Sequence, residues 1–185
     1  VMDVAKEPVI GASVVVMGST NGCITDFDGN LVEGKGKPTR EALLHGLLYR
    51  ICPNVNAVVH THSPYATSFA IRGEPIEIYT TTAAAVFGGR IPVSDFATIG
   101  EEEIGKEIVE KIGEREAILI RNHGVFTIGK DSQKALKNAI VLEETAQYVH
   151  YAMCRGNLTP LSDETVKRGY EVYHRTYGQN IKNKE

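Results

Sequence analysis

The amino-acid sequence predicts a layered α/β domain, and two patterns carry that prediction. Short runs of apolar and β-branched residues predict buried strands at Asn56–His60, Ala117–Arg121 and Val125–Ile128. Longer segments with apolar residues three and four positions apart predict helices at Arg40–Cys52, Glu101–Ile112 and Ser132–Arg155. Strands and helices alternate without strict βαβ regularity, so we expect helices layered on a sheet.

The amino-terminal quarter is predicted to hold short strands followed by the first helix. Gly11–Met17 is an apolar, strand-like run. The turn residues Asp28-Gly29-Asn30 separate Ile24–Phe27 from Leu31–Glu33, which predicts a β-hairpin. Thr39 can cap the helix that begins at Arg40, and Pro53 follows its end.

The remaining elements follow from the same signals. A helix over Pro64–Ile71 is predicted to stop at Gly73. Ile76–Thr82 has the composition of a strand, while the small residues of Ala83–Gly89 permit close backbone approach. Ser162–Tyr177 is predicted to be the last helix, followed by a polar tail.

The composition indicates one soluble domain. The chain has 185 residues, of which 42% are hydrophobic and 23% charged, so residues 1–185 suit a single core. A net charge of -3 and the short apolar runs give no reason to expect a nucleic-acid or membrane partner. The three cysteines, Cys23, Cys52 and Cys154, form no C-x-x-C pair, which favours a reducing, cytoplasmic location.

Three histidines stand at the predicted ends of apolar strands. His60 and His62 are two positions apart on one strand, so both side chains lie on the same face, about 6–7 Å apart along the backbone. His123 follows another apolar strand, and three imidazoles with one open position are typical of catalytic zinc. From the spacing alone, a metal site and a chance pairing are equally good explanations. The other histidines lie within predicted helices and are expected to be structural: His45, His150 and His174.

Four short motifs, in order along the chain, resemble those of the class II aldolase and adducin head family. They are Lys37-Pro-Thr-Arg-Glu41, Val59-His-Thr-His-Ser63, Asn122-His-Gly124 and Thr176-Tyr-Gly178. The resemblance implies a three-layer α/β/α domain around a largely antiparallel sheet. It also implies a homotetramer whose active sites lie at subunit interfaces.

The resemblance assigns roles to particular residues. His60, His62 and His123 would ligate Zn²⁺. Glu41 would be the catalytic acid/base, although by itself a first-turn acid can merely complement the helix dipole. Tyr177 would be a second proton-handling group, supplied by a neighbouring subunit.

The implied substrate is a phosphorylated sugar. Thr39 and Arg40 would bind its phosphate, although Arg40 stands where a second Ser or Thr is usual and could equally face solvent. The family's G-N-x-S loop and K-P-[ST]-G turn are not found in Val1–Thr25. We therefore expect the amino-terminal part of the domain to be shortened or divergent.

The resemblance leaves the reaction itself open. Thr80–Gly89 lacks the acid of the family's epimerases and resembles the Ala-Ala-Ala-Gly-Gly stretch of its aldolases. This favours an aldolase that cleaves a ketose 1-phosphate, similar to L-fuculose 1-phosphate, into dihydroxyacetone phosphate and an aldehyde. The alternatives are L-ribulose-5-phosphate 4-epimerisation through the same retro-aldol step and a non-catalytic, adducin-like interaction module. Tyr79 is either a further active-site tyrosine or a packing residue.

Overall fold

The central layer of the fold is a small antiparallel sheet. The computed structural model describes residues 12–15, 22–25, 31–34, 42–52, 54–96 and 102–176. Strands β4 (Ala57–Thr61), β6 (Gly124–Gly129) and β5 (Ala117–Ile120) form the sheet in the order β4-β6-β5. Both pairs are antiparallel, with Phe126 opposite His60 on one side and Ile118 on the other.

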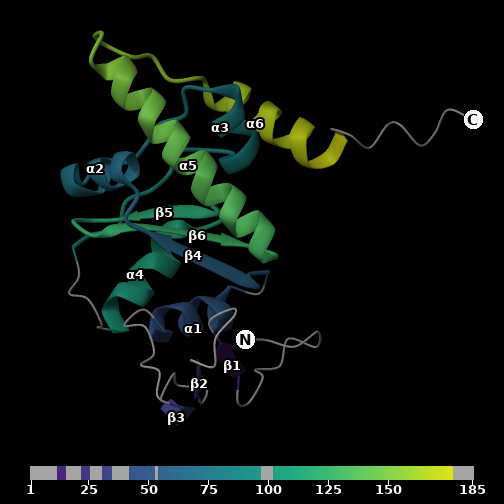
Figure 1. Ribbon diagram of the computed structural model, residues 1–185. Helices are drawn as coiled ribbons and strands as arrows, with labels where there is room; N and C mark the ends of the chain where they lie inside the picture. The colour runs from purple at the N-terminus through teal and green to yellow at the C-terminus, as the bar shows by residue number, and fades with distance from the viewer. Residues whose placement is uncertain are drawn as a thin grey trace, which may run out of the picture.

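Helices cover both faces of this sheet (Figure 1). On one face lie α2 (Pro64–Arg72), α3 (Thr81–Phe87) and α5 (Ser132–Met153). On the other face lie α1 (Ala42–Ile51) and α4 (Glu102–Ile112). The predicted three-layer α/β/α arrangement around an antiparallel sheet is therefore confirmed.

The alternation of side chains along β5 explains why the sheet is buried on both faces. Ala117 and Leu119 pack into the hydrophobic cluster beneath α2, α3 and α5. Ile118 and Ile120 point the opposite way, into the cluster formed with α1 and α4. A strand whose residues all meet a helix layer has no polar face, which is why its sequence, Ala-Ile-Leu-Ile, is continuously apolar.

A second sheet contains β1 (Ala12–Val15), β2 (Gly22–Thr25) and β3 (Leu31–Gly34) in antiparallel order β1-β2-β3. The pairing of β2 with β3 confirms the hairpin predicted from the Asp-Gly-Asn turn. The helix predicted to end before Pro53 is α1, and the one predicted to stop at Gly73 is α2. Gly73 adopts φ 66°, the left-handed conformation that ends a helix readily when no Cβ is present.

The segment Ile76–Thr82 was predicted to be a strand, and this prediction is wrong. Ile76 forms only an isolated bridge with Ile91, and Thr81 already belongs to helix α3. The Thr80 hydroxyl accepts a hydrogen bond from the Ala83 amide and so caps α3. The β-branched threonines suggested a strand, but their capping capacity decided the local structure.

The last predicted helix changes its geometry before its end. Helix α6 (Asp163–Glu171) begins at Ser162, whose hydroxyl accepts from the Thr165 amide. It continues as a π-helical turn, η1 (Val172–Thr176). Within the described part of the chain, no helix combines the length and apolar character needed to span a membrane.

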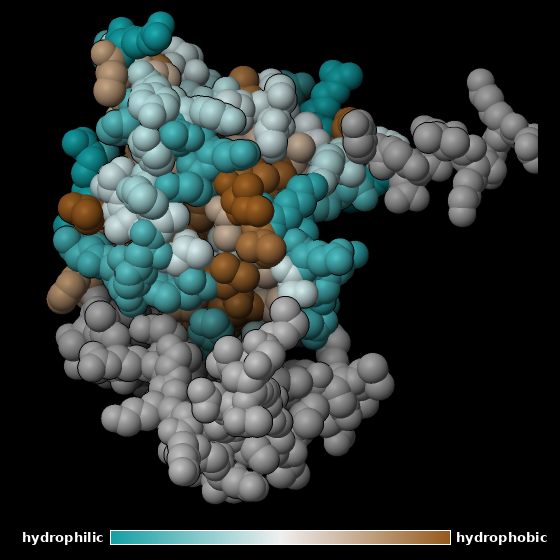
Figure 2. Space-filling model, in the orientation of Figure 1, coloured by the Kyte–Doolittle hydropathy of each residue, from teal (hydrophilic) through white to brown (hydrophobic). Residues whose placement is uncertain are grey.

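The longest helix, α5, has one buried and one exposed face. Its Asp131 cap accepts from the Lys134 amide. Figure 2 shows hydrophobic side chains gathered over the part of α5 that lies in front of the sheet. Leu136 and Ile140, one helical turn apart, are each more than half exposed.

Candidate metal centre

His60 is held in a fixed orientation near the end of β4. Its Nδ1 lies 2.9 Å from the carbonyl oxygen of Val125 on β6, and a proton on Nδ1 is donated to that oxygen. The ring also stacks on Phe126, with 4.2 Å between ring centroids and an interplanar angle of 20°. These contacts engage Nδ1 and direct Nε2 toward the other two histidines, which is the arrangement of a metal-binding histidine.

His62 follows the last residue of β4 and is exposed. Its Nε2 lies 3.0 Å from Nε2 of His60. When His60 keeps its proton on Nδ1, the proton between the two Nε2 atoms belongs to His62, and a bound cation would replace it. The two imidazoles lie side by side, as the spacing of two positions predicted, although His62 lies just past the end of the strand.

His123 reaches the same point from the turn between β5 and β6. Asn122, within this turn, has a φ of 59°, a conformation that asparagine tolerates better than most residues. The Asn122 amide donates to the Ala70 carbonyl at 3.1 Å, and the His123 amide donates to the Ile120 carbonyl at 3.0 Å. The His123 ring centroid consequently lies 4.9 Å from those of both His60 and His62.

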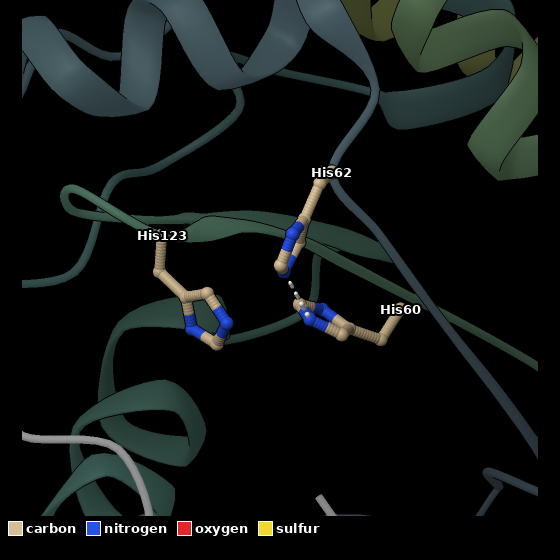
Figure 3. A group of neighbouring side chains, drawn as sticks. All are labelled: His60, His62 and His123. Atoms are coloured by element: carbon tan, nitrogen blue, oxygen red, sulfur yellow. Dashed lines mark hydrogen bonds between the residues drawn. The ribbon is translucent and has the colours of Figure 1, made fainter.

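The three imidazoles converge on one point, as Figure 3 shows. One ligand nitrogen from each ring lies within 4.8 Å of the other two. Tetrahedral zinc with Zn–N bonds of about 2.0–2.1 Å would place its ligand nitrogens about 3.3 Å apart. Small ring movements are enough to reach that spacing, so the donor set fits a divalent metal such as zinc.

Gly124 makes this convergence sterically possible. A Cβ at this position would lie 2.6 Å from the Thr61 carbonyl oxygen and 2.7 Å from Cδ2 of His62. Any other residue would push the first residue of β6 away from the end of β4. Sequence reasoning recognised Asn122-His-Gly124 as a motif but did not identify this close approach, which depends on a partner strand far away in the sequence.

The other residues predicted for the site are not all placed. Thr39, Arg40, Glu41 and Tyr177 lie outside the described residues, so their roles stay predictions. Tyr79 packs against the core cluster under α5, and burial raises its pKa. This position favours the packing role for Tyr79.

The helical histidines predicted to be structural lie against aromatic rings. His150 lies 5.5 Å from the Tyr65 ring, and His174 lies 4.1 Å from the Tyr170 ring. His45 is different because its partner belongs to the site: its ring lies 5.8 Å from that of Phe126, on which His60 stacks. No local sequence pattern indicates this link between α1 and the metal centre.

Comparison with known proteins agrees with this geometry. Residues 11–150 match the Class II Aldolase and Adducin N-terminal domain. The chain belongs to this family. Two L-ribulose-5-phosphate 4-epimerases, from Salmonella paratyphi A and Salmonella typhi, are each 37% identical to it in alignments 165 residues long that cover 82% of this chain and 72% of theirs.

Solved structures of the family have the same fold. An L-fuculose 1-phosphate aldolase superimposes with a TM-score of 0.77 at 27% identity, covering 83% of this chain and 72% of that protein. A sugar-phosphate aldolase from Thermotoga maritima superimposes with a TM-score of 0.55 at 26% identity, covering 70% of this chain and 60% of that protein. The sequence relatives thus carry an epimerase name, while these structural relatives carry aldolase names.

Proposed function

We propose that the chain is a zinc-dependent enzyme that breaks a carbon–carbon bond of a phosphorylated ketose by retro-aldol chemistry. The observation that carries this proposal is the convergence of His60, His62 and His123 in a chain of the class II aldolase family. When bound, the metal would act as a Lewis acid that stabilises negative charge on the substrate oxygens. An adducin-like module has no need of three imidazoles aimed at one point.

The chain's own residues would handle the protons. In the sequence, Glu41 comes directly before Ala42, the first residue of α1, and four residues before His45. His45 lies beside Phe126, and Phe126 supports the His60 ring. These contacts link α1 to the metal centre, and the resemblance of Lys37-Pro-Thr-Arg-Glu41 to the family motif supports Glu41 as the acid/base. Thr39 and Arg40, earlier in the same segment, are the proposed phosphate ligands.

We propose 4-epimerisation of a pentulose 5-phosphate, such as L-ribulose 5-phosphate, as the overall reaction. The support is the 37% identity to the two Salmonella epimerases over most of this chain. In such a reaction, cleavage of the carbon–carbon bond forms an aldehyde and an enediolate. The aldehyde rotates within the site, and the enediolate then adds to its opposite face to form the bond again. This choice reverses the preference for cleavage that the sequence motifs suggested.

Aldol cleavage of a ketose 1-phosphate is the second candidate, and a specific segment favours it. Thr80–Gly89 contains no carboxylate, and most of it forms the small helix α3. An epimerase must move protons on both faces of the aldehyde. In this chain the acid for the second face would have to come from outside this segment. The fold match to L-fuculose 1-phosphate aldolase supports the same candidate.

One assay separates the two reactions and tests the proposal. The zinc-loaded protein is incubated with L-ribulose 5-phosphate and, separately, with L-fuculose 1-phosphate. Epimerised pentulose phosphate is measured by NMR, and dihydroxyacetone phosphate is measured with a coupled dehydrogenase. We expect epimerisation to dominate. Release of dihydroxyacetone phosphate alone would favour the aldolase, and no turnover with either substrate would contradict both.

A Glu41→Gln variant tests the acid/base assignment in the same assay. We expect turnover to fall by about a hundredfold or more, as is typical for loss of a general acid/base. If Glu41 only complemented the helix dipole, activity would persist and the stability loss would stay below about 1 kcal/mol. Zinc content and melting temperature should be measured on the same sample to separate these results.

A homotetramer with shared sites is the proposed assembly, and the position of η1 supports it. Tyr173 and His174 of η1 line a hollow together with Gly129, the last residue of β6. The histidines lie at the other end of β6, about six residues or 20 Å away. Tyr177 is the next residue in the sequence after η1, and we propose that it serves the metal centre of a neighbouring subunit.

Mixed oligomers test this sharing. Tyr177→Phe should slow turnover without changing zinc content, because only the hydroxyl is lost. Mixing Tyr177→Phe subunits with Glu41→Gln subunits should raise activity above that of either variant alone, since some sites then contain both intact residues. Verified mixed oligomers without recovery would contradict the shared site.

A further inference from the structure

Helix α2 is capped by a side chain from another helix. Pro64, its first residue, has no amide hydrogen, and the Ser63 side chain makes no capping hydrogen bond. The next two amides, of Tyr65 and Ala66, donate to Oε1 and Oε2 of Glu143, each at 2.9 Å. The Thr67 amide begins the regular helix by donating to the Ser63 carbonyl at 2.9 Å. Glu143 therefore satisfies the two orphan amides of this helix terminus.

This cap lies close to the metal centre along the chain. Only Ser63 and Pro64 separate His62 from the capped amides. Ser63 has extended backbone angles, φ -64° and ψ 133°, and the proline ring fixes the next φ. The connection has little freedom, so a shift of the first turn of α2 moves the backbone of His62 with it.

Glu143 ties this turn to the part of the fold that carries the other ligands. It lies on α5, which packs on both β4 and β6. His60 belongs to β4, and its Nδ1 is held by the Val125 carbonyl of β6. His62, by contrast, has left the strand and is exposed, so its position depends on the segment that follows it.

We propose that Glu143 is a positioning residue for the metal centre. By holding the first turn of α2 against α5 through two charge-assisted hydrogen bonds, it fixes the exposed His62 relative to His60. The geometric part of this proposal is independent of the bound metal. Its consequence for metal affinity rests on the proposed zinc function.

The test is a Glu143→Gln variant compared with two controls. Glutamine has nearly the same shape, but its amide nitrogen cannot accept, so one of the two α2 amides loses its partner and faces another donor. Glu144→Gln is the matched control because Glu144 is the exposed neighbour on the same helix. Val149→Ala is the stability control, since it opens a cavity at a buried position of α5 without touching the cap.

Two readouts separate positioning from a merely structural role. The first, without added metal, is the NMR contact between the ring protons of His60 and His62, whose centroids lie 4.9 Å apart. The second is Co²⁺ affinity, measured by chelator competition and by the visible spectrum of the bound ion. We expect Glu143→Gln to weaken the ring contact and lower Co²⁺ affinity about tenfold, as for other residues that support metal ligands. Both controls should match the wild type in these readouts.

The possible failures point to different conclusions. An unchanged ring contact and unchanged Co²⁺ affinity in Glu143→Gln would overturn the proposal, leaving Glu143 as a helix cap only. Equal losses in Val149→Ala would also overturn it, because general destabilisation would then explain the effect. If the wild type bound no Co²⁺, the proposed metal function would fail, while the ring contact would still decide the positioning role. Should Glu143→Gln not fold, Glu143→Asp, which is too short to reach both amides, takes its place.

Discussion

The two ends of the β4-β6-β5 sheet are built from the same strands but carry different chemistry. At one end, His60, His62 and His123 turn their ring nitrogens toward one another. At the other end, charged side chains meet partners of opposite sign, as Lys134 does with Glu116 at 2.7 Å. Hollows of about 760 Å³ and 740 Å³ lie at this second end, around Arg115 and η1.

The two ends differ in the chemistry of the side chains that gather there. Imidazole is a common metal ligand, and three of them at one point are typical of a zinc site with an open position. Paired charges of opposite sign have an ordinary structural explanation in partly buried surface. At the histidine end, ligand nitrogens of three imidazoles lie within 4.8 Å of one another, and the His60 ring is supported by Val125 and Phe126 of β6, so this end suits a divalent cation.

The largest effect should follow from removing one imidazole. His62→Ala should lose bound zinc and with it nearly all turnover, because two histidines do not complete the three-ligand set of a catalytic zinc. Zinc content is measured by elemental analysis after reconstitution and dialysis, and turnover by the two substrate assays. His174→Gln removes an imidazole at the opposite end and serves as the control, with zinc content expected to match the wild type. Full zinc content in His62→Ala would contradict the proposal that the metal binds at the histidine end of the sheet.

A pair of glycines gives a sharper comparison, because Gly124 and Gly129 are the first and last residues of β6. A Cβ at Gly124 would lie 2.6 Å from the Thr61 carbonyl oxygen, and a Cβ at Gly129 would lie 2.6 Å from the Ala135 amide nitrogen. Both alanine variants should therefore lose about 1–3 kcal/mol of unfolding free energy through overpacking. Denaturant titration measures this loss.

Only one of these variants should affect the metal. In Gly124→Ala the new methyl also meets Cδ2 of His62 at 2.7 Å, so the ring must move and Co²⁺ affinity should fall about tenfold or more. Gly129→Ala should keep wild-type affinity, because its clash involves the start of α5. Equal affinities in the two variants would show that the metal centre tolerates movement of β6.

The sequence predicted the layers and the clustering of three histidines because both depend on local patterns. Apolar periodicity marked the buried strands and the long helices, and strand-end histidines within recognisable motifs marked the imidazoles that converge. Helix α3 was missed because threonine has two opposed tendencies: its β-branched shape favours strands, and its hydroxyl can cap a helix. The hydrogen bond from the Ala83 amide to the Thr80 hydroxyl shows that capping decides here.

The supporting contacts of the site were not predictable from the sequence. Glu143 lies 77–78 residues from the amides it caps, and Val125 lies 65 residues from His60. Neither residue type suggests such a role in its own neighbourhood, since a glutamate in a helix usually faces solvent. The motifs also could not decide between epimerase and aldolase. They favoured cleavage, whereas similarity over most of the chain favours epimerisation.

The smallest effect concerns His174, at the end of the sheet away from the metal centre. Desolvation against its neighbours lowers the pKa of His174 below its ordinary value of 6.5, and the nearby Lys134 lowers it further. In the window between that lowered pKa and about 6.5, the unfolded chain binds more protons than the folded chain, so stability falls as the pH falls. Above pH 6.5 the imidazole is neutral in both states, and below the folded-state pKa the loss of stability is complete.

His174→Gln should therefore show a smaller drop in melting temperature than the wild type between pH 7.5 and pH 5. The difference should be about 1 °C or less, because the side chain is exposed and its interactions are screened. The three site histidines are the same in both proteins, so they do not affect the comparison. A larger acid sensitivity in the variant would mean that Glu116 stabilises protonated His174, which would reverse the expected sign.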